Sequence, residues 1–220
     1  MVTSHCAYSK IYGFDTAEFA VSGLSLDALH DNLDSTINAS KGDHGHAACR
    51  FNPPCLGSGQ ASTLLYGEFR AYAGLCEDVP RNVLAFWLIA QGVTGGHLPY
   101  LALPSITWDA RSTTGRGYVQ GRFRGTAEVY GEAEWRFGLS RDGFLGGALF
   151  VNAVTFSRPA VSLPAYGNRQ PAENLFRYLK PAGGSGLRFM TNKESRTNVR
   201  LDFAWGVDSF GVYLGAGEAF

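Results

Sequence analysis

The stretch AEVYGEAEWRFGL, from Ala127 to Leu139, decides the fold class. Its alternate positions form an apolar set of Ala127, Val129, Ala133, Trp135, Phe137 and Leu139, and a mostly charged set of Glu128, Tyr130, Glu132, Glu134 and Arg136. Successive side chains of an extended strand point to opposite faces, so this period of two predicts a strand with one apolar and one charged face.

A second stretch, near the C-terminus, repeats this alternation. Between Thr197 and Gly206 the apolar residues Val199, Leu201, Phe203 and Trp205 alternate with Asn198, Arg200, Asp202 and Ala204. One face of each strand is too polar for the inside of a β-sandwich. The two strands therefore predict a sheet that is apolar on one side and charged on the other.

Seven further segments are strand candidates, at 17–29, 43–53, 60–76, 82–95, 144–158, 185–191 and 210–220. Turn signals such as Gly57-Ser58-Gly59 and Asp142-Gly143 lie between them. Together with the first two strands they predict an antiparallel all-β fold of about nine strands. We expect an irregular N-terminal segment at 1–16 and one β-domain at 17–220. Two connections are long, at 96–125 and 159–177.

The composition excludes several classes of protein. The chain has 19 basic and 19 acidic residues in 220, so bulk positive charge for nucleic-acid binding is lacking. An apolar content of 45% excludes a disordered chain. The longest uncharged apolar run, from Val83 to Ala90, is far shorter than the roughly 20 residues of a spanning helix. The first fifteen residues show no export signal.

The lengths of the candidate strands favour a membrane β-barrel over a soluble sandwich, which stays open as the alternative. They match the 9 to 11 residues with which a tilted strand crosses a bilayer. Long loops at one end and short turns at the other are typical of outer-membrane barrels. Aromatic residues near predicted strand ends suit interfacial girdles, and these are Trp135, Phe137, Phe156, Trp205, Phe210 and Phe220.

Four motifs in order resemble the BamA/TamA family, outer-membrane assembly factors of the bacterial surface antigen type. They are GRGYVQGRFRG at 115–125, AEWRF at 133–137, LKPAGGSGLRF at 179–189, and NVRLDF at 198–203 with GEAF at 217–220. The resemblance extends over about 140 residues, from Val83 to the C-terminus. A weaker similarity upstream involves 31–42 and 50–53.

The resemblance implies a fold, a location and a function. In this family a sixteen-stranded barrel follows periplasmic POTRA domains and assists the insertion or translocation of other outer-membrane proteins. We therefore expect the C-terminal part of such a barrel, located in the bacterial outer membrane. Its expected partners are membrane lipids, nascent outer-membrane proteins and assembly lipoproteins, with no nucleic acid. About half of a barrel is present, so the chain is expected to be a fragment, with closure by self-association as the alternative.

The resemblance also implies a set of site residues. The motif arginine Arg116 is expected to reach into the barrel lumen, within a loop motif of Gly115, Arg116, Gly117, Tyr118, Arg122 and Arg124. Expected partners in the lumen are Glu132, Glu134, Asn152, Arg200 and Asp202, and the expected C-terminal signal comprises Tyr213, Gly217 and Phe220. The family usually has an aspartate where Asn152 stands, so we expect Asn152 to accept a weaker hydrogen bond from Arg116.

The residues themselves suggest two other kinds of site. The carboxylates of Glu128, Glu132 and Glu134 could form a catalytic pair, but a charged lumen wall explains them better. No hydrolase, nucleotide or zinc-protease motif occurs, so neither an enzyme nor a cofactor is expected. The spacing of His44, His46 and Cys49 is a weak metal pattern without a second cluster, and no metal is expected.

Arg111, Arg116, Arg122 and Arg124 crowd one loop, and we expect them to insert into the carboxylate-lined lumen rather than bind a polyanion. Cys6, Cys49, Cys55 and Cys76 are expected to be free thiols, although three pairings are formally open.

A pore or a surface-exposed transport or binding barrel without an assembly role is the alternative function.

Overall fold

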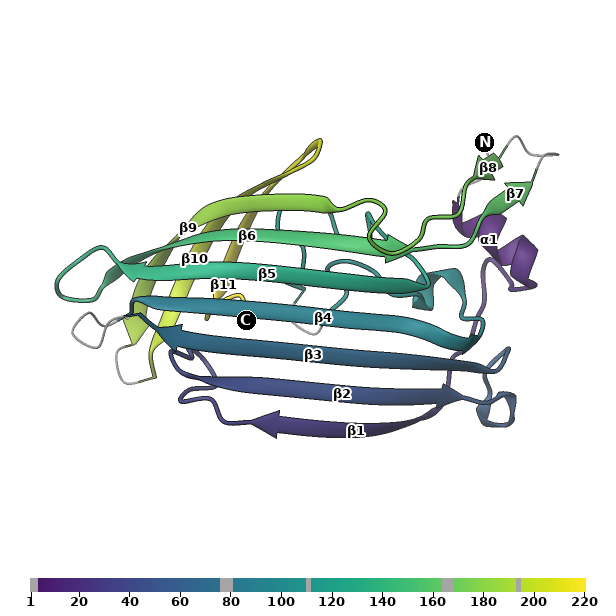
Figure 1. The fold of residues 1–220 in the computed structure, drawn as a ribbon, viewed down its shortest axis with the longest axis horizontal. Coiled ribbons are helices and arrows are strands. Elements are labelled where there is room, and N and C mark those ends of the chain that lie inside the picture. The colour runs from purple at the N-terminus through teal and green to yellow at the C-terminus, as the bar shows by residue number, and fades with distance from the viewer. Residues whose placement is uncertain (1–3, 76–80, 110–111, 164–167, 193–194) are drawn as a thin grey trace.

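The main body of the protein is one nine-stranded antiparallel sheet with strand order β1-β2-β3-β4-β5-β6-β9-β10-β11. The computed structural model describes residues 4–75, 81–109, 112–163, 168–192 and 195–220. The strands are β1 (Leu24–Asp31), β2 (Gly42–Asn52), β3 (Ser62–Gly74), β4 (Val83–Gly96), β5 (Ala127–Gly138), β6 (Leu145–Ser157), β9 (Lys180–Asn192), β10 (Thr197–Gly206) and β11 (Ser209–Ala216). Figure 1 shows the sheet curling until β10 and β11 lie behind β4 to β6. The prediction of a nine-stranded antiparallel all-β fold is confirmed.

Three strand boundaries differ from those predicted by four residues or more. β1 begins at Leu24 rather than at residue 17, and β11 ends at Ala216, four residues before the C-terminus. β9 begins at Lys180 rather than at residue 185. The early part of β9 is rich in glycine, and a glycine has no side chain to reveal an alternating pattern, so the sequence conceals this half of the strand.

Several short helices and strands lie at the end of the sheet that carries the long loops. The helix α1 (Ser4–Tyr12) lies in the segment predicted to be irregular, so that prediction is wrong. Its Tyr8 is buried with Leu98 and Leu103, so packing, rather than a strong amphipathic pattern, holds the helix. The other elements there are η1 (Pro54–Leu56), η2 (Tyr100–Ala102) and a hairpin of β7 (Val161–Leu163) and β8 (Asn168–Gln170). In the part of the chain that the structure describes, no helix is long and apolar enough to cross a membrane.

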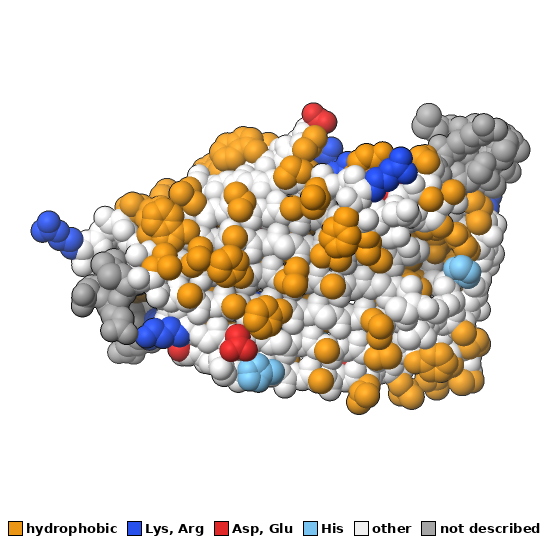
Figure 2. All heavy atoms as spheres, in the orientation of Figure 1, with side chains coloured by type: hydrophobic (Ala, Val, Ile, Leu, Met, Phe, Trp, Pro, Cys, Tyr) orange, Lys and Arg blue, Asp and Glu red, His pale blue; other side chains and the backbone are white. Residues whose placement is uncertain are grey.

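The two faces of the sheet differ as the alternation predicts. Alternate residues of β5 are buried on the concave face, while the exposed large apolar side chains include Phe86, Leu88, Trp135, Leu149, Val151, Val212 and Leu214. Figure 2 shows hydrophobic side chains spread over the convex side, with few charged side chains among them. The concave face instead carries the buried charges of β5, β9 and β10.

The aromatic residues only partly follow the predicted girdles. Trp135 and Phe137 form a pair on the convex face with ring centroids 4.7 Å apart, and Trp205 and Phe210 form another at 5.3 Å. Phe156 and Phe220 are instead buried within the main core, so their assignment to a girdle is wrong. Phe156 occupies one of the alternate positions of β6 whose side chains point to the concave face. Phe220 is buried because the chain turns toward the concave face after β11.

The weak metal pattern does not converge in space. His44 and His46 bond Asp31 and Asp27 on β1, at 3.1 and 3.0 Å. Cys49, an odd number of positions further along β2, lies on the opposite face of the strand. Among the described residues no three metal-ligating groups come together. Cys6, Cys49 and Cys55 are free thiols, and Cys76 lies outside the described residues.

Candidate functional site

The long loop between β4 and β5 folds back into the hollow of the sheet. Its Ile106 is fully buried and exchanges backbone hydrogen bonds with Phe123 (3.2 Å) and Gly121 (3.1 Å). The hydroxyl of Thr114 accepts a 2.8 Å hydrogen bond from the backbone N–H of Thr107. The loop therefore has its own internal framework, which presents the motif at 115–118 to the wall of the sheet.

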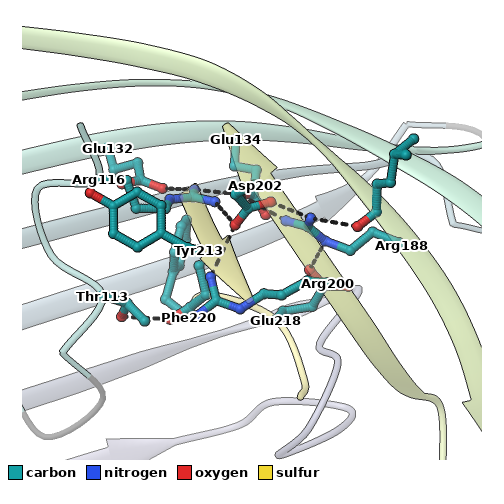
Figure 3. A network of polar contacts seen from close by, with 12 residues as sticks. Thr113, Arg116, Glu132, Glu134, Arg188, Arg200, Asp202, Tyr213, Glu218 and Phe220 are labelled. Carbon is teal, nitrogen blue, oxygen red and sulfur yellow. Dashed lines mark hydrogen bonds and ion pairs between the residues drawn. The ribbon is translucent and has the colours of Figure 1, made fainter. Parts of the chain in front are cut away.

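Arg116 lies at the centre of the contacts between loop and wall. Its side chain is only 1% exposed. The guanidinium donates to Asp202 Oδ2 at 2.8 Å and pairs with Glu132 and Glu134. The two glutamates come from β5 and the aspartate from β10, so one side chain ties the loop to two distant strands (Figure 3).

Three more arginines complete this network. Arg136 donates to Glu134 at 2.7 Å, and Arg188 donates to Asp202 at 2.5 Å and to Glu218 at 2.6 Å. Arg200 donates to Asp202 at 3.0 Å. The network, named here the lumen network, contains four arginines and four carboxylates, namely Arg116, Arg136, Arg188, Arg200, Glu132, Glu134, Asp202 and Glu218. Such charges are tolerated away from water because each one is paired.

The structure changes the expected role of Asn152. Its Nδ2 donates to the backbone carbonyl of Arg116 at 3.1 Å, so the prediction that it accepts from the guanidinium is wrong. The guanidinium instead lies over the ring of Phe150, 3.5 Å from its centroid. Asn152 therefore fixes the loop backbone, and Asp202 supplies the opposite charge.

The other motif arginines do not reach the carboxylates. Arg122 is exposed and donates to the carbonyl of Asp208 at 3.2 Å. Arg124 donates to the carbonyls of Leu101 and Leu103 at 2.6 and 3.2 Å. Neither lies within ion-pair distance of a carboxylate among the residues described, so the expected pairing with lumen carboxylates is not found for these two arginines. Arg111 lies outside the described residues.

Two tyrosine side chains form hydrogen bonds between the motif at 115–118 and the later part of the sheet. Tyr213 of β11 accepts a hydrogen bond from the backbone N–H of Gly117 at 2.8 Å. Tyr118 donates to the carbonyl of Pro181 at 2.5 Å and accepts from the N–H of Val207 at 3.1 Å. Tyr213, expected to belong to a C-terminal signal, thus lies against the loop.

The last four residues also turn into the concave side. Gly217 has a left-handed φ of 81° and donates to the carbonyl of Asn198 at 2.7 Å. The Phe220 ring stacks on Trp87 with centroids 5.1 Å apart, and its carbonyl accepts from Arg136 at 2.9 Å. Thr113 of the loop donates to the carbonyl of Ala219 at 2.9 Å. The C-terminus and the loop therefore contact each other inside the sheet.

The sequence indicates neither Arg188 nor Glu218 as a member of the network. Arg136 stands on the charged face of its strand, which predicts it as a balancing charge on the lumen wall. Arg188 lies in the glycine-rich β9, where the alternation is hard to see. A side chain at Gly186 would come within 1.9 Å of Asp202 Oδ1, so the absence of side chains there makes room for the network. Glu128 accepts from Gln91 at 2.8 Å and lies outside the network.

Replacement of Gly117 by alanine is expected to destabilise the folded protein by about 1–3 kcal/mol. Gly117 has a φ of 105°, and an added Cβ would lie 3.0 Å from the Ala182 side chain and 3.1 Å from the backbone of Gly206. Urea unfolding of the detergent-folded protein measures the change. Gly131→Ala is the matched control, because nothing lies within 4 Å of its added Cβ. Equal unfolding midpoints for the two variants would contradict the close approach of loop and wall.

Comparisons with known proteins support the fold. No family model and no curated protein sequence matches the chain. Among solved structures, the crystal structure of BamA from Haemophilus ducreyi lacking POTRA domains 1–3 is similar, with a TM-score of 0.68 and 13% sequence identity. The match covers 99% of this chain and 48% of that chain, so this chain spans about half the length of its structural neighbour. At this identity the similarity establishes the fold, which is that of part of an antiparallel β-barrel like the one in BamA.

Proposed function

We propose that residues 17–220 form part of the wall of an outer-membrane β-barrel that assists the insertion of other outer-membrane proteins. The observation that carries this proposal is the anchoring of the long loop by Arg116 to carboxylates of the concave face. It is supported by the similarity to the BamA fold. The GRGY-type motif at 115–118, which resembles that of the assembly factors, supplies the anchor.

The apolar convex face supports a location in a lipid bilayer. Strands of 8 to 14 residues have lengths comparable to those that cross a bilayer at a tilt. The convex face would contact lipid, while the charged concave face would line the lumen. Outer-membrane lipids are therefore the first proposed partner. Nascent outer-membrane proteins and assembly lipoproteins are the further partners that the function requires.

The edges of the sheet support completion of the barrel by additional strands. Among the residues that the structure describes, β1 and β11 each pair with a neighbouring strand on one side only. An unpaired strand edge in lipid leaves backbone groups without hydrogen bonds, at a cost of several kcal/mol per group. We infer that further strands, in the same or in another polypeptide, pair with both edges.

Cell fractionation combined with depletion tests the assembly function. We expect the chain in the outer-membrane fraction, insoluble in urea or carbonate and soluble in detergent. Depletion is expected to lower the amounts of unrelated outer-membrane barrels, since their insertion would slow. Recovery in the aqueous phase without detergent would eliminate the membrane proposal, whereas normal levels of other barrels would eliminate the assembly role alone.

The second candidate function is a pore or transport barrel. A cavity of about 670 Å³ on the concave side favours it, lined by polar residues that include Asp27, Arg50 and Glu128. Conductance of the protein in planar bilayers separates the two functions. Steady ion conductance without any effect of depletion on other barrels would favour the pore, since an anchored loop within the lumen predicts low conductance.

Cysteine labelling is expected to show the orientation of the barrel. Cys55 is exposed in the loop end of the molecule, whereas Cys49 is exposed on the convex face of β2. In single-cysteine variants on intact cells, a membrane-impermeant maleimide should label Cys55 within minutes and leave Cys49 unlabelled until detergent is added. The long loops of outer-membrane barrels lie on the cell surface, so the loop end of this chain, with Cys55, is expected to face the outside of the cell. Equal labelling of both cysteines in intact cells would contradict the proposed position of the convex face.

A further inference from the structure

A second cavity, named here the turn-end cavity, lies at the end of the sheet opposite α1. It has a volume of about 500 Å³, within the range of small-molecule sites. Its walls include residues of β5, β9 and β10 near the strand ends that lie farthest from α1, together with residues of the adjoining turns. Its lining also includes Phe137, whose ring pairs with Trp135 on the convex face.

Cations dominate the described lining of this cavity. Five arginines line it, together with two acidic residues, and these are Arg81, Arg136, Arg141, Arg188, Arg196, Asp142 and Glu218. The acidic side chains are already engaged by the protein. Glu218 accepts hydrogen bonds from Arg188 at 2.6 Å and from Asn198 at 2.5 Å. Asp142 accepts from the hydroxyl of Ser140 at 2.5 Å and the N–H of Phe144 at 3.1 Å.

Two of the arginines have no carboxylate partner among the described residues. Arg81 donates to the carbonyl of Gly143 and to Asn198 Oδ1, both of them neutral acceptors. Burial lowers the pKa of Arg81 below its ordinary value, although the nearby charge of Glu218 acts against this shift. Arg141 is exposed beside it and pairs with no described carboxylate. Arg196, by contrast, pairs with Asp34 at 2.9 Å.

The deeper arginines of the cavity retain unused hydrogen-bonding capacity. Arg136 and Arg188 are both more than nine-tenths buried. Arg136 Nη1 has no hydrogen-bond partner in the part of the chain that the structure describes, and Arg188 Nη2 has only an ion-pair contact of 3.5 Å with Glu134. Buried donors without a hydrogen-bond partner are rare in proteins. The two arginines at the entrance without a carboxylate partner and the unused donor of Arg136 below them point to the same class of ligand.

We propose that the turn-end cavity binds an oxyanion, and that a phosphate group is its best match. Guanidinium groups recognise phosphate through forked, charge-assisted hydrogen bonds, and several arginines around one cavity suit a multivalent anion. Arg81 and Arg141 would hold the anion at the entrance. This site is independent of the proposed assembly function, and neither depends on the other being correct.

Titration of inorganic phosphate into the full chain, folded in a neutral detergent at constant ionic strength, tests the site by calorimetry. We expect saturable binding to one site. Arg141→Gln is expected to weaken binding about tenfold, the effect of losing one charge-assisted contact. Arg81→Gln is expected to weaken it similarly, but it also removes contacts to Gly143 and Asn198. Arg141→Gln therefore remains the decisive variant if Arg81→Gln does not fold.

The matched control is Arg177→Gln, which removes an exposed arginine from the loop between β8 and β9, at the end of the sheet where α1 lies. It should bind phosphate as the unmodified protein does. A second arm replaces phosphate with phosphatidic acid in mixed micelles, against phosphatidylcholine micelles, to distinguish a soluble anion from a lipid headgroup. Binding in either arm that Arg141→Gln weakens supports the site. Absence of saturable binding in both arms, or equal weakening by Arg177→Gln, overturns it.

Discussion

Replacement of Arg116 by alanine is expected to lower the free energy of unfolding by about 3–5 kcal/mol. The guanidinium is the shared partner of Glu132, Glu134 and Asp202, and all three carboxylates are buried. Its removal leaves their negative charges close together without the cation at their centre. The loop would also lose its link between β5 and β10. Urea unfolding in detergent and heat-modifiable gel mobility measure the loss.

Two further variants distinguish the effect of losing the Arg116 charge from a general disturbance of the loop. Arg122→Ala removes an exposed arginine of the same loop, whose side chain donates to the backbone carbonyl of Asp208, and should change stability by less than about 1 kcal/mol. Arg116→Lys keeps the charge but cannot bridge three carboxylates with a forked geometry, so it should be intermediate. Wild-type mobility and full activity of Arg116→Ala would show that the loop is held by other contacts.

Replacement of Phe220 by alanine is expected to destabilise the protein by about 3 kcal/mol or more. The ring is 3% exposed and stacks on Trp87, and the Arg136 guanidinium lies 5.3 Å from the ring centroid. Truncation would leave a cavity between these side chains. Unfolding of the purified, refolded variant measures the effect without the assembly machinery of the cell.

This experiment also distinguishes packing from a signal role. If Phe220 served only as part of a C-terminal signal, its truncation would slow assembly in cells and leave the stability of the refolded protein unchanged. Phe210→Ala is the matched control, because that ring is 53% exposed on the convex face. A loss of stability for Phe210→Ala as large as that for Phe220→Ala would argue against the inward position of the C-terminus.

The alternating strands were predictable because their two faces have different environments. β5 and β10 carry apolar and charged residues in strict succession, so their existence follows from sequence. The start of β9 was hidden by glycines. The helix α1 was missed because Tyr8 contributes through contacts with Leu98 and Leu103, residues distant in sequence. A local sequence pattern does not show contacts between residues that are distant in sequence.

The candidate site was predictable only where motif and periodicity coincided. The motif resemblance pointed to Arg116, and alternation placed Glu132, Glu134 and Asp202 on the polar face. Neither could show that Arg122 and Arg124 turn toward backbone carbonyls, since loop geometry decides this. The inward turn of the last four residues likewise depends on the left-handed conformation of Gly217, which a strand pattern does not reveal.

The buried charges of the lumen network anchor the loop to the concave face of the sheet. A double-mutant cycle on Arg116→Ala and Asp202→Ala, measured by reversible unfolding of the detergent-folded protein, tests this anchoring most directly. The two side chains are 2.8 Å apart, so we expect a coupling energy of about 2 kcal/mol. Additive effects, within about 0.5 kcal/mol, would contradict it.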